Sequence, residues 1–307
     1  MRAGLRRPWL AVLLGGLCPG LGHLYAGAAW VAVAIPILAI LAAGGLGWAA
    51  ASGTLGPGGW LVGVLIIPCA TRGLAPLHAA WVARCVRPAQ PWQRAWVYLA
   101  FFLLAHLATW EGVRLCRAWL VEPFRVPSAS MAPTILPGDV LLVSHRLPAD
   151  LRSRVVLFVQ AGEVHVKRAV ARGGEVAEVV RGQVRIDGQD LPRRRCALGA
   201  DQPMAQHGAA AAFVETGADG RDYLVQWGPP LWSADLAATP IPEGALFVLG
   251  DNRDDSVDSR HWGPILEDQA IGTALAVLAS VDEDSGQPRW ERFGLPLAPD
   301  LPTWECR

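Results

Sequence analysis

Residues 124–145 read FRVPSASMAPTILPGDVLLVSH, and they divide the chain into two parts of different composition. Before them, residues 8–121 are nearly continuous Leu, Ala, Val, Ile and Trp. After them, short runs of β-branched residues alternate with Gly, Pro and Asp, which is the pattern of strands joined by turns. Because 307 residues allow two domains, we expect a membrane part followed by a water-soluble β part.

The water-soluble part, residues 122–307, is predicted to be a mostly antiparallel β domain. Residues 188–240 interrupt the pattern with three consecutive Arg and an Ala run, and we expect an inserted, smaller β-rich subdomain there. The runs that predict strands elsewhere are 140–145, 155–159, 163–170, 175–180, 183–187, 245–250 and 273–281.

The first part, residues 1–121, is predicted to be an N-terminal α-helical transmembrane region. Its first apolar stretch, residues 9–17, stops at Cys18-Pro19-Gly20 and is too short to cross about 30 Å of hydrocarbon. Arg72 falls near the middle of a later stretch, where a charge can mark a functional site. We favour the alternatives of a helix-pairing residue or a span that ends near Ala70. The expected spans are 28–51, 59–83 and 95–121.

Arginine placement sets the expected orientation of these spans. Arginines at the N-terminus and between the second and third spans favour the cytoplasm, whereas the uncharged connection 52–58 can face outward. Three spans then deliver residue 122 to the extracytoplasmic side. Two alternatives stay open: residues 9–25 could form a fourth span and reverse the orientation, or residues 1–28 could be a cleaved signal peptide.

Charge and cysteine usage exclude several classes of function. The 27 acidic and 27 basic residues cancel, so no overall field draws the chain to nucleic acid. Neither a CxxC pair nor an HExxH motif is present, and we expect no metal and no cofactor. A disulfide between Cys196 and Cys306 stays open, because both would lie on an oxidising side.

Lys167 is the only lysine among the 27 basic residues. Arg keeps its proton in a protein whereas a buried Lys can lose it, so a single lysine in an Arg-rich chain indicates a chemical role. Its apolar neighbours predict a buried strand, and burial lowers the pKa of an amine. Ser130 is a hydroxyl that needs such a base to become a nucleophile. The alternatives are a surface lysine beside Arg168 and a turn serine in a Pro-rich segment.

The third informative segment is GDNRDDSVDSRHWG, residues 250–263. It mixes Asn, Ser, Trp and Gly with paired opposite charges. This composition favours a rigid hydrogen-bonded scaffold over a solvated charged loop.

Together, these segments resemble the type I signal peptidases, the Ser/Lys-dyad membrane serine proteases that remove signal peptides. PSASMAPTILPGDV (127–140) resembles the nucleophile box of that family, VKRAV (166–170) its lysine box, and residues 250–263 its last box. Their order is preserved. The departures are Ala171 and Gly173-Gly174-Glu175, where the family has a Gly and a Pro-Gly-Asp turn, and Asp255 in place of a common Asn.

The resemblance implies a role for each matched residue. Ser130 would be the acylating nucleophile and Lys167 its general base, while the Ser128 hydroxyl and the Ser130 N–H would form the oxyanion hole. Ser256 would hydrogen-bond the Lys167 amine, and Asp258 and Arg260 would form a supporting ion pair. The shallow pockets for small substrate residues at −1 and −3 would be lined by Phe124, Val126, Pro127, Met131 and Val166.

The expected function is that of a membrane-bound serine endopeptidase that removes signal peptides from exported preproteins after Ala-X-Ala sites. The expected partners are those signal peptides and the lipid bilayer, with no nucleic acid and no metal. We expect a multi-pass protein of a bacterial inner membrane with its catalytic domain in the periplasm. The alternatives are a specialised peptidase for one pilin or secreted partner, and a non-catalytic membrane adaptor that retains the fold.

Overall fold

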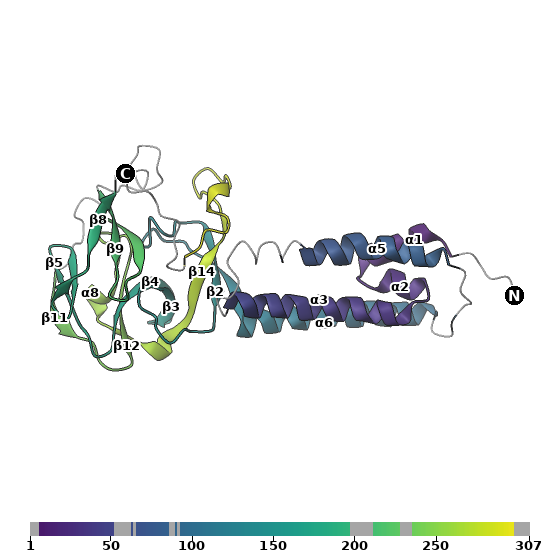
Figure 1. Cartoon of the computed structure of the whole chain (residues 1–307), viewed down its shortest axis with the longest axis horizontal. Coiled ribbons are helices and arrows are strands. Elements are labelled where there is room, and N and C mark those ends of the chain that lie inside the picture. Colours follow the sequence, from purple (N-terminus) through teal and green to yellow (C-terminus); the bar gives the residue numbers. More distant parts are fainter. Residues whose placement is uncertain are drawn as a thin grey trace. The chain divides into compact units, whose positions relative to one another are not determined.

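The structure is a computed structural model, and it describes residues 6–51, 63, 66–85, 90, 93–196, 211–227 and 235–297, without the side chains of 50–51 and 116–119. The chain forms two compact units, Met1–Leu120 and Val121–Arg307. The first is helical and the second is built from strands (Figure 1). Cys306 and the predicted connection 52–58 lie outside the described residues, so the question of a Cys196–Cys306 disulfide stays open.

Two helices of the first unit are long and apolar enough to cross a membrane within the part of the chain that is described. These apolar stretches are Ala29–Ala49 and Ala95–Leu115. The predicted span 59–83 is described only in part, as a π-helical turn that contains Arg72, followed by a helix. The helices of this unit are α1 (Pro8–Leu17), α2 (Leu21–Tyr25), α3 (Ala29–Ala51), η1 (Cys69–Leu74), α5 (Ala75–Ala83) and α6 (Ala95–Trp119).

Helix α1 ends where the sequence predicts a break, at Cys18-Pro19-Gly20. Gly20 adopts a φ of 93°, a conformation that residues with a Cβ rarely adopt. A Cβ at Gly20 would also lie 2.1 Å from the carbonyl oxygen of Ala32. Glycine therefore allows α2 to fold back closely against α3.

The second unit is organised around a seven-stranded sheet with the order β1-β2-β14-β3-β4-β12-β13. All of its neighbouring strands pair antiparallel, as the alternation of apolar runs and turns predicts. Its strands are β1 (Val121–Arg125), β2 (Asp139–Ser144), β3 (Val155–Gln160), β4 (Glu163–Arg172), β12 (Ala245–Leu249), β13 (Ile265–Leu266) and β14 (Ala270–Ser280).

The central strands of this sheet are covered on both sides. Val155 and Leu157 of β3 belong to one apolar cluster, whereas the intervening Val156 and Phe158 belong to another. Because successive side chains of a strand point to opposite faces, both faces of β3 are buried. All five residues of β12 are buried as well. The middle of β4, residues 166–171, lies between these two strands and is buried.

Two smaller antiparallel sheets occupy the chain between β4 and β12. One has the order β11-β5-β6-β7 and the other the order β10-β9-β8. Their strands are β5 (Val176–Val180), β6 (Gln183–Ile186), β7 (Gln189–Asp190), β8 (Arg193–Cys196), β9 (Ala211–Thr216), β10 (Asp222–Trp227) and β11 (Leu236–Pro240). Three short helical turns complete the unit, namely α8 (Ser259–Trp262), η2 (Glu267–Gln269) and η3 (Trp290–Arg292).

Candidate active site

Lys167 lies in the middle of β4, where it pairs with Val156 in the register with β3. Its side chain is 4% exposed. The Lys167 ammonium nitrogen, Nζ, lies 2.6 Å from Ser130 Oγ. The structure thus brings the lone lysine and the candidate nucleophile, 37 residues apart in the chain, into direct hydrogen-bond contact.

Burial controls the charge of this lysine. It lowers the pKa of Lys167 from 10.5 to about 8, because the low-dielectric surroundings disfavour the charged amine. The nearby carboxylates of Asp258 and Asp251 raise the pKa and so limit the shift, while the Arg260 guanidinium lowers it. A substantial fraction of the amine is therefore neutral in mildly alkaline solution and able to accept a proton.

The loop that carries Ser130 is held by the segment that follows β12. The Asn252 N–H donates to the Ser130 carbonyl oxygen at 3.1 Å. The Asn252 side-chain amide donates to the Ala129 carbonyl oxygen at 3.2 Å. Within the loop, the Ala132 N–H donates to the same Ala129 carbonyl oxygen at 2.9 Å. The position of Ser130 is thus set by hydrogen bonds from residue 252, a part of the third sequence motif.

Ser128 lies next to Ser130, as its implied role requires. The Ser130 N–H donates to Ser128 Oγ at 3.1 Å. The two groups expected to act as oxyanion donors are therefore bonded to each other in this state. A developing oxyanion would have to replace the Ser128 oxygen as the acceptor of the Ser130 N–H.

Ser256 differs from its implied role. Its side chain is buried, but no hydrogen bond joins it to Lys167 among the described residues. The Ser256 hydroxyl lies instead against the Cα of Gly250, where an added Cβ would come within 2.2 Å of Ser256 Oγ and 2.6 Å of the Ser130 carbonyl oxygen. The Lys167 amine is instead hydrogen-bonded to Ser130 Oγ.

Asp258 and Arg260 form a buried ion pair at 2.8 Å. Asp258 also accepts the Gly250 N–H at 2.9 Å and caps the short helix α8. Burial raises the pKa of Asp258, but the hydrogen bond and charge of Arg260 outweigh it and hold the pKa below its ordinary value. The Arg260 guanidinium donates onward to the Arg253 carbonyl oxygen at 2.6 Å, so the pair ties both ends of the loop 250–260 together.

Most of the residues predicted to line the substrate pockets share one apolar cluster. Val126, Met131 and Val166 are buried in it, and Phe124 is half-buried against it. Pro127 is exposed. Four of the five flank Ser130 in the chain, and Val166 immediately precedes Lys167.

Sequence reasoning missed a set of buried charges beside Ser130 and Lys167. Arg168 makes a bidentate ion pair with Asp251, at 2.7 and 2.6 Å. Arg253 pairs in the same way with Glu215. The paired opposite charges in residues 250–263 were the sequence feature that could have indicated buried ion pairs of Asp251 and Arg253. Nothing in the sequence marked Glu215.

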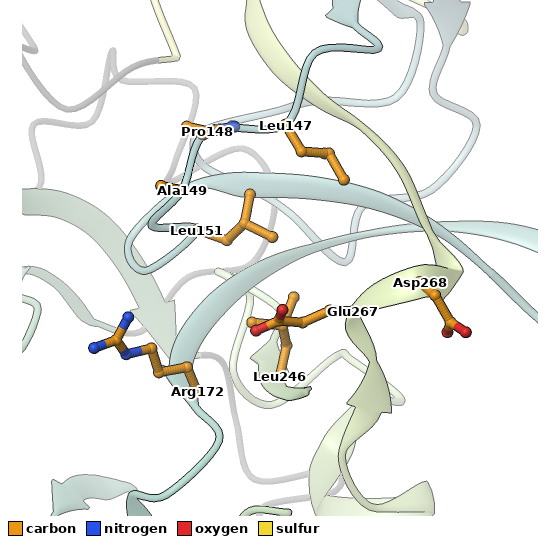
Figure 2. Close-up of a pocket in the computed structure, with 8 residues that line it drawn as sticks. All are labelled: Leu147, Pro148, Ala149, Leu151, Arg172, Leu246, Glu267 and Asp268. Carbon is orange, nitrogen blue, oxygen red and sulfur yellow. The ribbon is translucent and has the colours of Figure 1, made fainter. Parts of the chain in front are cut away.

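A surface pocket of about 340 Å³ lies elsewhere in the second unit (Figure 2). Its lining includes none of the predicted site residues. Apolar side chains from the loop 147–151 and from β12 form part of it, and Arg172, Glu267 and Asp268 supply the charges. Within the described residues, no group of three or more His, Cys, Asp or Glu side chains is arranged to hold a metal ion.

Known proteins match this chain over the region that holds the site. Residues 93–279 match the family described as "Signal peptidase, peptidase S26". The probable signal peptidase I-1 of Synechocystis sp. is 32% identical over 174 residues, which cover 52% of this chain and 72% of that protein. The signal peptidase I of Pseudomonas fluorescens is 31% identical over 215 residues, covering 60% and 74%. The signal peptidase I V of Bacillus subtilis is 31% identical over 179 residues, covering 56% and 94%.

The family match spans well over half of the chain and contains all three sequence motifs. It confirms the resemblance drawn from those motifs and makes the chain a hydrolase, which counts against the adaptor alternative. The contact between a serine hydroxyl and a buried amine is the kind of site that such chemistry needs. The chain belongs to the type I signal peptidase family and is a serine peptidase that removes signal peptides.

Proposed function

We propose that Ser130 is the nucleophile and Lys167 the general base of this peptidase. The observation that carries the proposal is the 2.6 Å contact between Lys167 Nζ and Ser130 Oγ on a lysine that is 4% exposed. A neutral amine in this position accepts the hydroxyl proton as Oγ attacks the scissile carbonyl carbon. The protonated amine then gives that proton to the departing amino group, and an acyl-enzyme remains on Ser130.

Deacylation uses the same base. Lys167, neutral again, takes a proton from a water molecule that attacks the ester carbon, and returns it to Ser130 Oγ. The Ser128 hydroxyl and the Ser130 N–H donate to the carbonyl oxygen as it becomes negative. Their mutual hydrogen bond of 3.1 Å supports this assignment, because it places both groups at one point beside the nucleophile. Neither step needs a metal or a cofactor.

The substrate is proposed to bind as an extended strand with small residues at −1 and −3, as in Ala-X-Ala sites. Strand β1 ends the seven-stranded order, so one of its sides carries no strand partner within the described sheet. An extended peptide can add to such a side through backbone hydrogen bonds. The cluster of Phe124, Val126, Met131 and Val166, with Pro127 exposed beside it, would admit only small side chains.

The first unit is proposed to anchor the enzyme in a bacterial inner membrane by spans 28–51, 59–83 and 95–121, with residues 122–307 in the periplasm. The apolar stretches Ala29–Ala49 and Ala95–Leu115 support this. A signal peptide still in the bilayer would then meet the enzyme at a raised effective concentration. We also propose that the two smaller sheets between β4 and β12 form an inserted subdomain, because β4 and β12 pair directly with each other.

Cleavage of a preprotein with an Ala-X-Ala site by the detergent-solubilised full-length enzyme tests this function. We expect one cut after the −1 Ala, and we expect Ser130→Ala to abolish it. The matched control is Ser285→Ala, since Ser285 lies in an exposed turn. Cleavage by Ser130→Ala at the wild-type rate would exclude the proposed nucleophile. A panel of unrelated preproteins distinguishes a general enzyme, which cuts many, from a peptidase specialised for one partner.

A further inference from the structure

A buried charge cluster joins the hairpin β9–β10 to the loop that follows β12. Glu215 on β9 is 0% exposed and accepts two hydrogen bonds from the Arg253 guanidinium, at 2.5 and 3.1 Å. The Tyr223 hydroxyl on β10 donates to the same carboxylate at 2.8 Å. Glu215 therefore compensates a charge that belongs to the third sequence motif.

The hairpin also holds the backbone of that loop. The Gln226 N–H on β10 donates to the Asp251 carbonyl oxygen at 2.8 Å, and the Arg253 N–H donates to the Gln226 carbonyl oxygen at 3.0 Å. Residues 226 and 252 form a parallel bridge. The Arg253 side chain donates back to the Gly250 carbonyl oxygen at 3.2 Å. The loop is thus fixed on β10 on both sides of Asn252, the residue that holds Ser130.

The same hairpin reaches the other member of the dyad through Arg168. The Arg168 guanidinium lies 4.5 Å above the centre of the Tyr223 ring and pairs with Asp251. Arg168 directly follows Lys167 on β4. The Tyr223 ring thus contacts Arg168, the residue after Lys167, and the Glu215 carboxylate contacts Arg253, the residue after Asn252. We call these two hydrogen-bonded side chains, Tyr223 and Glu215, the platform.

Burial makes this platform sensitive to the loss of a single charge. Arg253 is 2% exposed and Arg168 is also 2% exposed. A buried guanidinium left without its carboxylate is strongly unfavourable, so the side chain moves or water enters. Either change would remove the Arg253 side-chain contacts that support the loop 250–253 and would loosen its attachment to β10, where the backbone hydrogen bonds to Gln226 remain.

We propose that Glu215 is a positioning residue for the Ser130–Lys167 pair: by fixing Arg253, it holds residues 250–252 against the carbonyl groups of the Ser130 loop. This inference rests on the proposed dyad. It assigns a role to a hairpin that lies outside all three motifs. Glu215 touches no reacting atom in this account and acts only through Arg253 and Asn252.

The test is Glu215→Gln in the full-length enzyme, because Gln keeps the size of the side chain and removes its charge. We expect kcat for preprotein cleavage to fall about tenfold or more, with KM within about twofold, since the change is remote from the substrate. Release of the loop would admit water to Lys167. The acidic limb of the pH–rate profile should therefore move to higher pH, toward the ordinary value for lysine.

The matched control is Asp222→Asn on the same hairpin. Asp222 accepts Arg194 in an exposed ion pair and the Thr216 hydroxyl at 2.6 Å, an acceptor role that the Asn oxygen keeps. Among the described residues, no hydrogen bond or ion pair joins Asp222 to the loop 250–253 or to the dyad. We expect wild-type kcat and an unchanged pH profile. A loss of kcat equal to that of Glu215→Gln would show that the hairpin tolerates no charge change and would overturn the specific role of Glu215.

A second readout does not depend on cleavage. Because Lys167 is the only lysine, reductive methylation with ¹³C-formaldehyde gives one side-chain NMR signal, which Lys167→Arg identifies by its loss. We expect its titration midpoint to rise in Glu215→Gln and to stay in place in Asp222→Asn. An unchanged midpoint and kcat in folded Glu215→Gln would overturn the inference. A wild-type enzyme that cuts no preprotein would instead refute the proposed function, and the NMR result would still decide the inference.

If Glu215→Gln alone does not fold, a double variant tests the same role. Glu215→Gln combined with Arg253→Met removes both charges and leaves no lone buried guanidinium. If this double variant folds, judged by circular dichroism, we expect the same loss of kcat and the same rise of the Lys167 midpoint. Wild-type values for both would overturn the proposal.

Discussion

At the scale of single residues, the proposed mechanism depends on one amine that burial keeps easy to deprotonate. A lysine on a strand between two buried strands loses much of its hydration, and its pKa falls to about 8. Arg could not serve, since its guanidinium keeps its proton at any such pH. The proposed role as a base gives a chemical reason for a single lysine at this position of an Arg-rich chain.

Activity is expected to follow the neutral form of Lys167. Because the folded pKa is about 8, kcat/KM should rise roughly tenfold per pH unit below that pH and level off above it. Initial rates of preprotein cleavage between pH 6 and 10 measure this profile. A rate that is constant across that range would rule out a lysine base.

Burial of Lys167 is expected to cost stability. The folded pKa of about 8 lies below the unfolded value of 10.5, so the unfolded state binds more protons between these pH values and stability rises with pH there. Below pH 8 the full cost applies, on the order of 3 kcal/mol for a shift of this size. Lys167→Met should thus unfold at a higher urea concentration than wild type at pH 7, and cleave nothing. The gain in urea midpoint over wild type should be smaller at pH 10 than at pH 7, because wild-type Lys167 is neutral at pH 10. A Lys167→Met variant less stable than wild type at pH 7 would contradict the expected cost of burial.

At the scale of elements, buried ion pairs hold the loop 250–260, because Asp251, Arg253, Asp258 and Arg260 each have an oppositely charged partner. Asp258 alone accepts from Gly250, Arg260 and the N-terminus of α8.

Asp258→Ala is expected to lower the free energy of unfolding by about 3 to 5 kcal/mol, since it leaves Arg260 buried without its partner. Urea denaturation followed by circular dichroism measures the change. The control is Asp190→Ala, which removes an exposed ion pair with Arg185 and should cost less than about 1 kcal/mol. Equal losses in the two variants would show that burial of the Asp258–Arg260 pair adds nothing.

The sequence predicted more of the elements than of their contacts. The strands around 140–145, 155–159, 163–170 and 245–250 are present within a few residues, because alternation and turn residues are local signals. The contact between Ser130 and Lys167 required the family resemblance, since no local pattern encodes a pairing across the sheet. The pairing of Glu215 with Arg253 could not be predicted, nor could the missing hydrogen bond between Ser256 and Lys167. The partner of a buried polar group is decided by tertiary packing.

At the scale of the whole molecule, the chain combines a helical unit with candidate membrane spans and a β unit that carries the site. A peptidase that acts on signal peptides gains from this combination, because its substrate is itself held in the bilayer. The proposed orientation places the β unit and the cleavage site of the signal peptide on the same, extracytoplasmic side of the membrane.

Protease treatment of intact spheroplasts tests the orientation. With three spans, externally added proteinase K should digest residues 122–307 and leave protected fragments of the first unit. Detection by antibodies against each unit, before and after detergent lysis, gives the result. Protection of residues 122–307 until lysis would place the catalytic unit in the cytoplasm and favour the arrangement with a fourth span.

Comparing preprotein cleavage by wild type and by Lys167→Arg tests most directly whether Lys167 is the general base. Arg keeps the positive charge and approximate length of lysine but does not give up its proton. We predict that the folded variant loses cleavage by about a thousandfold or more, while Arg168 and the rest of the buried network stay intact. Cleavage by folded Lys167→Arg at the wild-type rate would contradict the account, because Lys167 would then be a structural residue and Ser130 would need another base.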